Sequence, residues 1–235
     1  MVLRRIHVSH IVVGEVELDP AAAHQARKVL RLEDGTRVEV FDDAGAVAPA
    51  TLLFRGTAGA AVRVEEIVSP TPRGTKLVIA SAVPKGDRAD WMVEKLSEIG
   101  VYEFIPLAAE RSVVLPEGKS KRERWIRLAT EAARQSRRSG VMSIAPLSSV
   151  AAVISRDPGF GGYLSTEPGA VSMHSALADL PPNQRLTLFI GPEGGWTKQE
   201  IEIFHVSDVC PLRLTNTILR VETAAILSAG LVLSR

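Results

Sequence analysis

The chain has 235 residues, of which 46% are hydrophobic and 23% charged, and its formal net charge is +1. This composition excludes wholesale disorder and fits one large or two modest globular domains. Because the net charge is close to zero, a nucleic-acid-binding surface would have to come from local clusters of cations.

Cysteine and histidine usage limits the chemistry further. Cys210 is the only cysteine, which excludes an intramolecular disulfide and a cysteine-rich zinc site. The five histidines show no metal-ligand spacing, so no metal is expected. The N-terminus lacks the apolar region of a signal peptide, and the longest apolar stretch, Thr223 to Leu233, is too short to span a bilayer. We therefore expect a cytoplasmic protein without membrane attachment.

The first 68 residues predict short strands and turns with one helix. Asp19-Pro20 is typical of a helix start, and the helix would carry residues 24–30. Asp34-Gly35 predicts a turn, after which Arg37 to Phe41 alternates as a half-buried strand does. These patterns indicate a small β-barrel or sandwich.

Two prolines and a glycine in the segment 69–74 predict a linker. We expect one domain over residues 1–70 and a second over residues 74–235. In the second, apolar strand patterns alternate with helical ones, which favours an α/β fold with a mainly parallel sheet. The expected strands cover residues 76–82, 102–107, 162–165, 185–190 and 209–214. Gly100 is expected to end the first helix of this domain.

A glycine-rich turn follows the expected strand at 185–190. Residues 188–200 read LFIGPEGGWTKQE, and Thr197 with Glu200 predicts a capping box that opens a helix. Ligands of open α/β sheets bind beyond the carboxyl ends of strands, where this turn would lie. A phosphate loop is not favoured, because GxxxxGK[ST] is missing and Glu193 would repel phosphate. The acidic turn suits a cation, and S-adenosylmethionine is compatible with it. A plain strand-to-helix turn explains the same residues equally well.

A second stretch, ILRVETAA at residues 218–225, leads into the last apolar helix. Thr223 is the candidate N-cap of that helix, with Arg220 and Glu222 close to its amino end. Taken alone, these two charges are better explained as a solvated pair.

GPEGGW followed by a distal LRxETA resembles the C-terminal signature of the RsmE family within the SPOUT methyltransferases. Residues 4–8 and 24–35 look like the family's PUA-like domain, residues 85–100 resemble its first SPOUT helix, and residues 131–138 match EAxxQSxR. The resemblance covers nearly the whole chain. One departure is that residues 214–217, Leu-Thr-Asn-Thr, stand where the family has Leu-Gly.

The resemblance implies a PUA-like β-barrel followed by a trefoil-knotted SPOUT domain with a parallel sheet. It also implies a homodimer, S-adenosyl-L-methionine as cofactor, and methylation of uridine N3 in 16S ribosomal RNA of the small subunit. By match, the cofactor-binding residues are Leu164, Ser165, Thr166, Ile190, Gly191, Pro192, Glu193, Gly194, Gly195, Leu212, Leu214, Leu219, Thr223 and Ala224.

Eight basic and two acidic residues lie between Lys119 and Arg138, a net charge of +6 that suits phosphate binding. The alternative is a solvated amphipathic helix with Trp125, Leu128 and Ala132 facing inward. The aromatic content of 5% argues against broad stacking platforms. From charge and resemblance, the expected RNA-binding residues are Arg4, Arg5, His24, Arg27, Lys28, Arg31, Lys85, Arg134, Gln135 and Arg138.

Uracil N3 carries a proton and no free lone pair, so a proton must leave as the methyl group arrives. By motif match and chemical type, Glu222 is the expected general base, and Arg220 is expected to stabilise charge on the uracil oxygens. N3 lies on the Watson–Crick edge, so the uridine must be unpaired or flipped out. Two alternatives are a SPOUT enzyme that acts on another RNA position and a catalytically silent RNA-binding ribosome-assembly protein.

Overall fold

The computed structural model describes residues 3–68, 74–116, 118–156, 159–178, 180–181 and 183–234. The chain divides into two compact units, residues 1–73 with 133–141 and residues 74–132 with 142–235. Residues 69–73 of the expected linker lie outside the described part. The boundaries expected from the sequence, 1–70 and 74–235, stay a prediction, and the structure adds the segment 133–141 to the first unit.

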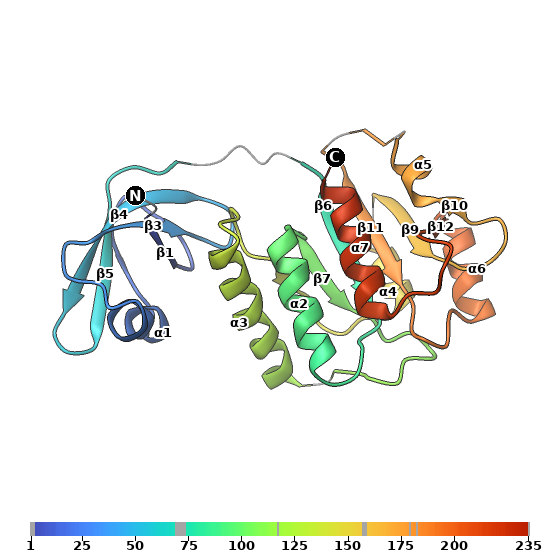
Figure 1. Ribbon diagram of the computed structural model, residues 1–235, viewed down its shortest axis with the longest axis horizontal. Helices are drawn as coiled ribbons and strands as arrows, with labels where there is room; N and C mark the ends of the chain where they lie inside the picture. Colours follow the sequence, from blue (N-terminus) through green and yellow to red (C-terminus); the bar gives the residue numbers. More distant parts are fainter. Residues whose placement is uncertain are drawn as a thin grey trace. The chain divides into compact units, whose positions relative to one another are not determined.

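The N-terminal unit is built on a five-stranded mixed sheet (Figure 1). The strands are β1 (Arg4–His7), β2 (Gly14–Glu17), β3 (Arg37–Phe41), β4 (Val47–Arg55) and β5 (Gly59–Val64), in the order β1-β3-β4-β5-β2. β1 pairs with β3 in parallel, and the other pairs are antiparallel. Alternate residues of β3 and β4, among them Val38, Val40 and Leu52, are fully buried and form the core.

One helical segment follows β2. The helix α1 (Pro20–His24) begins where the sequence predicted, because the Asp19 carboxylate accepts a hydrogen bond from the Ala22 amide at 2.8 Å. It continues as the π-helical turn η1 (Gln25–Val29), in which Gln25 O accepts from Leu30 N at 2.9 Å. The helix expected over residues 24–30 is therefore present, with wider turns than expected.

The C-terminal unit holds a seven-stranded sheet in which every described strand pair is parallel. Its strands are β6 (Lys76–Ser81), β7 (Glu103–Pro106), β8 (Ser143–Ile144), β9 (Phe160–Leu164), β10 (Val171–Ser172), β11 (Arg185–Ile190) and β12 (Cys210–Arg213), in the order β10-β12-β9-β11-β6-β7-β8. β6 and β11 are buried beyond their first residues, as strands covered on both faces are. The parallel α/β sheet expected from the sequence is confirmed.

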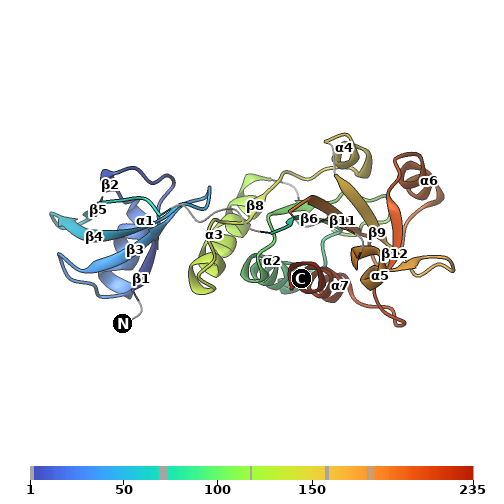
Figure 2. The ribbon, with the colours of Figure 1, turned by 90° about the horizontal axis from the view of Figure 1, so that it is seen from above.

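Helices cover both faces of this sheet (Figure 2). They are α2 (Asp87–Ile99), α3 (Lys119–Gln135), α4 (Val150–Ile154), α5 (Met173–Ala178), α6 (Lys198–Val206) and α7 (Val221–Leu233). α2 and α7 pack together on one face, and α4 and α6 lie on the other. α2 ends at Gly100, whose φ of +114° gives the left-handed cap expected there.

Candidate cofactor and substrate site

Four loops lie side by side at one edge of the C-terminal sheet. They follow β6, β9, β11 and β12, which are neighbouring parallel strands, so their carboxyl ends meet at the same edge. Backbone hydrogen bonds hold the loops in register: Ala82 N donates to Ile190 O at 2.9 Å, and Ser165 N donates to Leu212 O at 2.9 Å. The sheet therefore brings together segments that are far apart in the sequence.

The loops after β9, β11 and β12 enclose a cavity of about 400 Å³. It is lined by twelve of the residues expected to bind cofactor: Leu164, Ser165, Thr166, Ile190, Gly191, Pro192, Glu193, Gly194, Gly195, Leu214, Leu219 and Ala224. The lining does not include Leu212, which is fully buried within the sheet, or Thr223, which faces a second hollow. The structure thus gathers most of the expected set in one place, and their role in binding stays a prediction.

Several further residues line the cavity that the motif match did not select: Arg111, Glu167, Trp196, Ile201, Thr215, Thr217, Ile218 and Val221. Most of them lie in or beside the segments that the sequence had singled out. Arg111 belongs to no motif, yet its Nη1 donates to Gly194 O at 2.7 Å and so fastens the glycine-rich loop.

Trp196 forms one wall of the cavity and explains the need for glycine at position 191. Its Nε1 donates to Leu164 O at 2.9 Å, and its ring meets Phe204 edge-on at 5.0 Å. A Cβ atom added to Gly191 would lie 2.9 Å from the Trp196 ring, closer than real Cβ contacts come. The close approach of loop and ring therefore requires residue 191 to lack a side chain.

The helix after the glycine-rich loop begins with the expected capping box. Thr197 Oγ1 accepts from Glu200 N, and Glu200 Oε2 accepts from Thr197 N at 2.9 Å. Glu200 is buried, and its second oxygen accepts from Glu110 N at 3.0 Å. One carboxylate therefore fixes both the start of α6 and the segment that carries Arg111.

A second, open hollow lies around the start of α7 and is lined by Asp87, Arg88, Trp91, Arg220, Glu222 and Thr223. Glu222 is only 5% exposed, and its Oε1 lies 3.3 Å from Arg88 Nη1. Its Oε2 is buried without a hydrogen-bond partner among the described residues. Arg88 Nη1 also lies 4.0 Å from Glu193 in the glycine-rich loop.

Two expectations about this stretch are wrong. Arg220, not Thr223, is the N-cap residue of α7, so Thr223 falls inside the first turn. Arg220 and Glu222 also do not form a solvated pair, because Glu222 is buried and pairs with Arg88 on α2. The first turn of α7 contributes to both the cavity and the open hollow, since Val221 and Ala224 line the cavity while Glu222 and Thr223 line the open hollow.

The residues expected to bind RNA fall into two groups. Those exposed to solvent are Arg4, His24, Lys28, Arg31, Lys85 and Gln135. Arg5 is buried and pairs with Glu39 at 2.7 Å while donating to Arg138 O at 2.9 Å.

Three more of these residues, Arg27, Arg134 and Arg138, are at least partly buried. Arg27 lies over the Phe54 ring at 4.0 Å and donates to Gly59 O at 3.1 Å. Arg138 is partly buried, and this burial lowers the pKa of its guanidinium to about 10. Arg134 is partly buried. Arg5 and Arg27 therefore have structural partners of their own, whatever they contribute to binding.

Within the part of the chain that the structure describes, no group of three or more His, Cys, Asp or Glu side chains is placed to hold a metal ion. None of the helices described is long and apolar enough to cross a membrane.

The family profile described as "RNA methyltransferase domain" matches residues 71–233. That match, together with a parallel sheet that carries a cavity at its carboxyl edge, defines an RNA methyltransferase of the SPOUT type. The chain belongs to the family of ribosomal RNA small subunit methyltransferase E, the RsmE family.

Two relatives illustrate the membership, and one solved structure has the same fold. The family member from Synechocystis is 32% identical over 233 residues, which cover 91% of this chain and 71% of the relative. The member from Bacillus subtilis is 39% identical over 158 residues, and this match spans only 62% of the relative's length. The crystal structure of the member from Neisseria gonorrhoeae, bound to S-adenosylmethionine, has a TM-score of 0.82 at 23% identity and covers 97% of this chain and 95% of its own.

Proposed function

We propose that this chain uses S-adenosylmethionine to methylate N3 of a uridine in 16S ribosomal RNA of the small subunit. It acts in the cytoplasm and, as the family resemblance implies, as a homodimer. The observation that carries the reaction type is the buried carboxylate of Glu222, which lines the open hollow and has one oxygen without a hydrogen-bond partner among the described residues. Membership of the RsmE family supports the choice of RNA and cofactor.

The cavity fits the cofactor in size and in chemistry. Its volume of about 400 Å³ falls within the range of small-molecule sites, roughly 300–1,000 Å³. Apolar side chains such as Ile190 and Leu219 suit an adenine ring, and the carboxylates of Glu167 and Glu193 suit a cation. When bound, S-adenosylmethionine supplies a methyl group on a positively charged sulfur.

Residues of this chain accept the N3 proton of the uracil and stabilise the negative charge that develops on its oxygens. Glu222 Oε2, which has no partner in the described part of the chain, accepts the N3 proton of the uracil, while Arg88 holds the carboxylate through Oε1. Arg220 is exposed at the amino end of α7. There its guanidinium and the positive end of the helix dipole stabilise negative charge on the uracil oxygens.

RNA is held by exposed basic side chains, which contact its phosphates. The N-terminal unit offers Arg4, His24, Lys28 and Arg31, and the C-terminal unit offers Lys85 after β6. Arg5 and Arg27 contribute indirectly, by keeping the sheet and the π-helical turn in shape.

The test is methyl transfer to small ribosomal subunits prepared from cells that lack the protein. With purified protein and S-adenosylmethionine, mass spectrometry of the RNA should find one new 3-methyluridine. Methylation at a ribose or at another base would favour the related SPOUT activity. Cofactor binding without any transfer to RNA would favour the ribosome-assembly protein.

A further inference from the structure

We infer that the open hollow beside Glu222 is the binding site of the flipped target uracil, and that Trp91 is the surface on which the base stacks. The inference rests on the proposed function and adds to it the residues that select the base. Trp91 comes from the first turns of α2, and Glu222 and Arg220 come from the start of α7.

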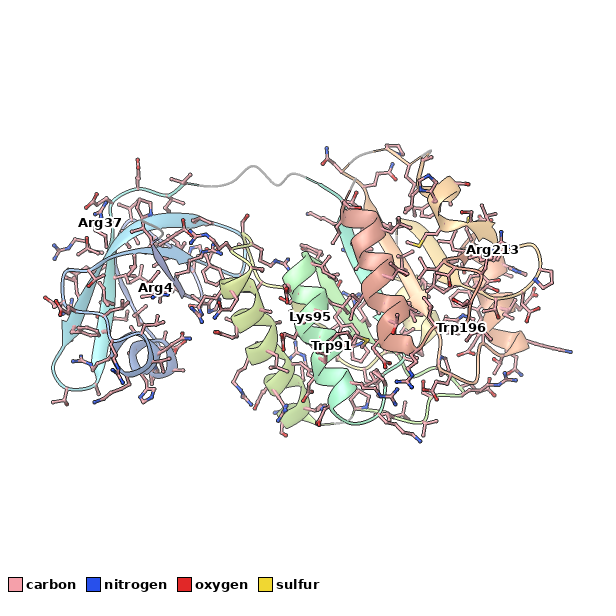
Figure 3. All side chains as sticks on the ribbon, in the orientation of Figure 1. Arg4, Arg37, Trp91, Lys95, Trp196 and Arg213 are labelled. Atoms are coloured by element: carbon pink, nitrogen blue, oxygen red, sulfur yellow. The ribbon has the colours of Figure 1, made fainter. Side chains whose placement is uncertain are left out.

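The exposure of Trp91 is the first observation. The chain has three tryptophans, and Trp91 is 48% exposed, although a tryptophan has the largest surface to bury. Trp125 is buried and donates to Asp90 at 2.8 Å, and Trp196 builds a wall of the cavity. Figure 3 shows Trp91 on α2 and Trp196 farther along the same unit. An exposed indole that lines a hollow suits a planar partner, because each base stacked on an aromatic ring contributes about 1–3 kcal/mol.

The unpaired oxygen of Glu222 is the second, independent observation. A buried carboxylate oxygen without a partner in the described residues points to a ligand that donates a hydrogen bond there. Uracil presents the N3–H donor between two carbonyl acceptors on its Watson–Crick edge. The hollow offers the complementary groups, because the Glu222 acceptor lines it together with the guanidinium groups of Arg88 and Arg220.

This pattern selects uracil over cytosine. Cytosine has an unprotonated N3 and an amino group in place of the O4 carbonyl, so it would turn a lone pair toward the Glu222 carboxylate. A buried polar group left facing the wrong partner loses its hydrogen bond and keeps its desolvation cost. Enzymes that extrude a base combine stacking with recognition of the Watson–Crick edge in this way.

The hollow also lies next to the cofactor cavity. Val221 and Ala224 line the cavity, while Glu222 and Thr223 of the same helical turn line the hollow. Arg88 spans the boundary, with its Nη1 3.3 Å from Glu222 and 4.0 Å from Glu193. A base stacked on Trp91 would therefore present its edge beside the methyl donor.

The test measures coupling between the side chain and the base. Two RNA hairpins are used, one with the uridine that the protein methylates and one with an abasic residue in its place. We expect the unchanged protein to bind the uridine hairpin roughly tenfold more tightly. Trp91→Ala should bind both hairpins equally, and Trp91→Phe should keep most of the difference, because a phenyl ring still stacks. Tyr102→Ala is the matched control, since Tyr102 is 44% exposed but precedes β7 at the opposite edge of the sheet.

A cytidine hairpin tests the edge pattern. The unchanged protein should bind it less tightly than the uridine hairpin, because cytosine stacks on Trp91 but faces the Glu222 carboxylate with a lone pair. Glu222→Gln should narrow the gap between uridine and cytidine, because an amide can donate to the cytosine N3.

The outcomes separate the inference from the proposed function. If small subunits are methylated at uridine N3 but Trp91→Ala keeps the full preference for the uridine hairpin, the stacking role is wrong and the function stands. If Trp91→Ala instead breaks the protein into smaller species in sedimentation, the hollow is a subunit interface and the inference fails. If no methylation of small subunits occurs, the proposed function itself fails.

Discussion

The two oxygens of Glu222 stand in different surroundings. Oε1 meets Arg88, whereas Oε2 is buried with no hydrogen-bond partner in the described part of the chain. An unsatisfied buried polar group typically costs about 1–3 kcal/mol, so an apolar side chain would suit the folded state better. This cost agrees with the proposal that the oxygen receives its hydrogen-bond partner from the substrate.

Glu222→Gln should abolish most of the chemistry and little else. A neutral amide cannot accept the N3 proton, so the rate constant of single-turnover methylation should fall by at least about a hundredfold. The Kd for S-adenosylmethionine, measured by calorimetry, should stay within about twofold. Glu94→Gln on α2 is the control, because Glu94 is partly exposed and pairs only with a neighbouring lysine among its described contacts. Full single-turnover activity in Glu222→Gln would show that another group takes the proton.

Gly191→Ala should weaken cofactor binding while the protein stays folded. The new Cβ would lie 2.9 Å from the Trp196 ring, so the loop or the ring must shift. We expect the Kd for S-adenosylmethionine to rise by about tenfold or more. Gly230→Ala on α7 is the matched control, since Gly230 lines neither the cavity nor the open hollow and no atom lies within 4 Å of a Cβ added there. Equal affinities for the two variants would mean that the loop and the ring do not shape the site.

At the scale of single residues, the sequence predicted which residue types form the site better than it predicted the contacts that those residues make. The LRxETA motif selected Glu222, but its carboxylate pairs with Arg88, which is 134 positions away in the chain. Arg111 carried no motif at all, because its function is to donate to the Gly194 carbonyl, 83 positions away. Contacts of this length form only when the sheet is assembled, so local patterns carry no trace of them.

Between elements, Asp90 ties α2 to α3. One carboxylate oxygen accepts from Lys121 at 3.0 Å and from Trp125 at 2.8 Å, and the other lies 2.6 Å from Arg124. Burial alone would raise the pKa of Asp90, but the hydrogen bonds from Lys121 and Trp125 and the nearby cations hold it below the usual value. The folded state therefore favours the charged carboxylate.

Asp90→Asn should lower the free energy of unfolding at pH 7 by about 1–2 kcal/mol. Because the folded pKa is depressed, the contribution is fully present above the unfolded pKa of about 4. It is lost as the pH falls through the lower folded pKa, so the variant and the unchanged protein should converge in acid. Urea unfolding at pH 7 and below pH 4 measures both values.

The control for Asp90 is Glu98→Gln. Glu98 is exposed and pairs with Lys95 three residues away on the same helix, so its change should stay within about 0.5 kcal/mol. A difference between Asp90→Asn and the unchanged protein that persists undiminished in acid would show that packing, not charge, accounts for the effect.

Long elements were predictable and short ones were not. β3 and β11 have the predicted bounds, because alternation or an apolar run between turn residues marks a strand. β8 and β10 have two residues each, too few for any pattern. The π-helical form of η1 was also missed, since composition indicates a helix but not how wide its turns are.

In the molecule as a whole, two arrangements follow from contacts that composition and periodicity do not encode. The strand order places β11 between β9 and β6, and the last helix returns past β9 and β11 to pack on β6. The segment 133–141 groups with the N-terminal unit, where Arg138 O accepts from Arg5, 133 positions earlier. The sequence predicted the class of each domain from its alternating elements, but family resemblance alone pointed to the SPOUT arrangement.

RNA affinity should depend on exposed cations of the N-terminal unit, so Arg4→Glu combined with Lys28→Glu should weaken binding of small-subunit RNA by about tenfold or more. Each lost phosphate contact removes counterion release, so the slope of log K against log salt should flatten by about one per contact.

Arg138 does not suit this test, because burial lowers its pKa to about 10 and a reversed charge there would disturb the fold. Arg37→Glu is the control, since Arg37 is exposed but pairs with Glu65 at 2.9 Å. Filter binding over a range of salt measures both quantities, and cofactor affinity should not change. An unaltered slope in the double variant would mean that phosphates are held elsewhere on the protein.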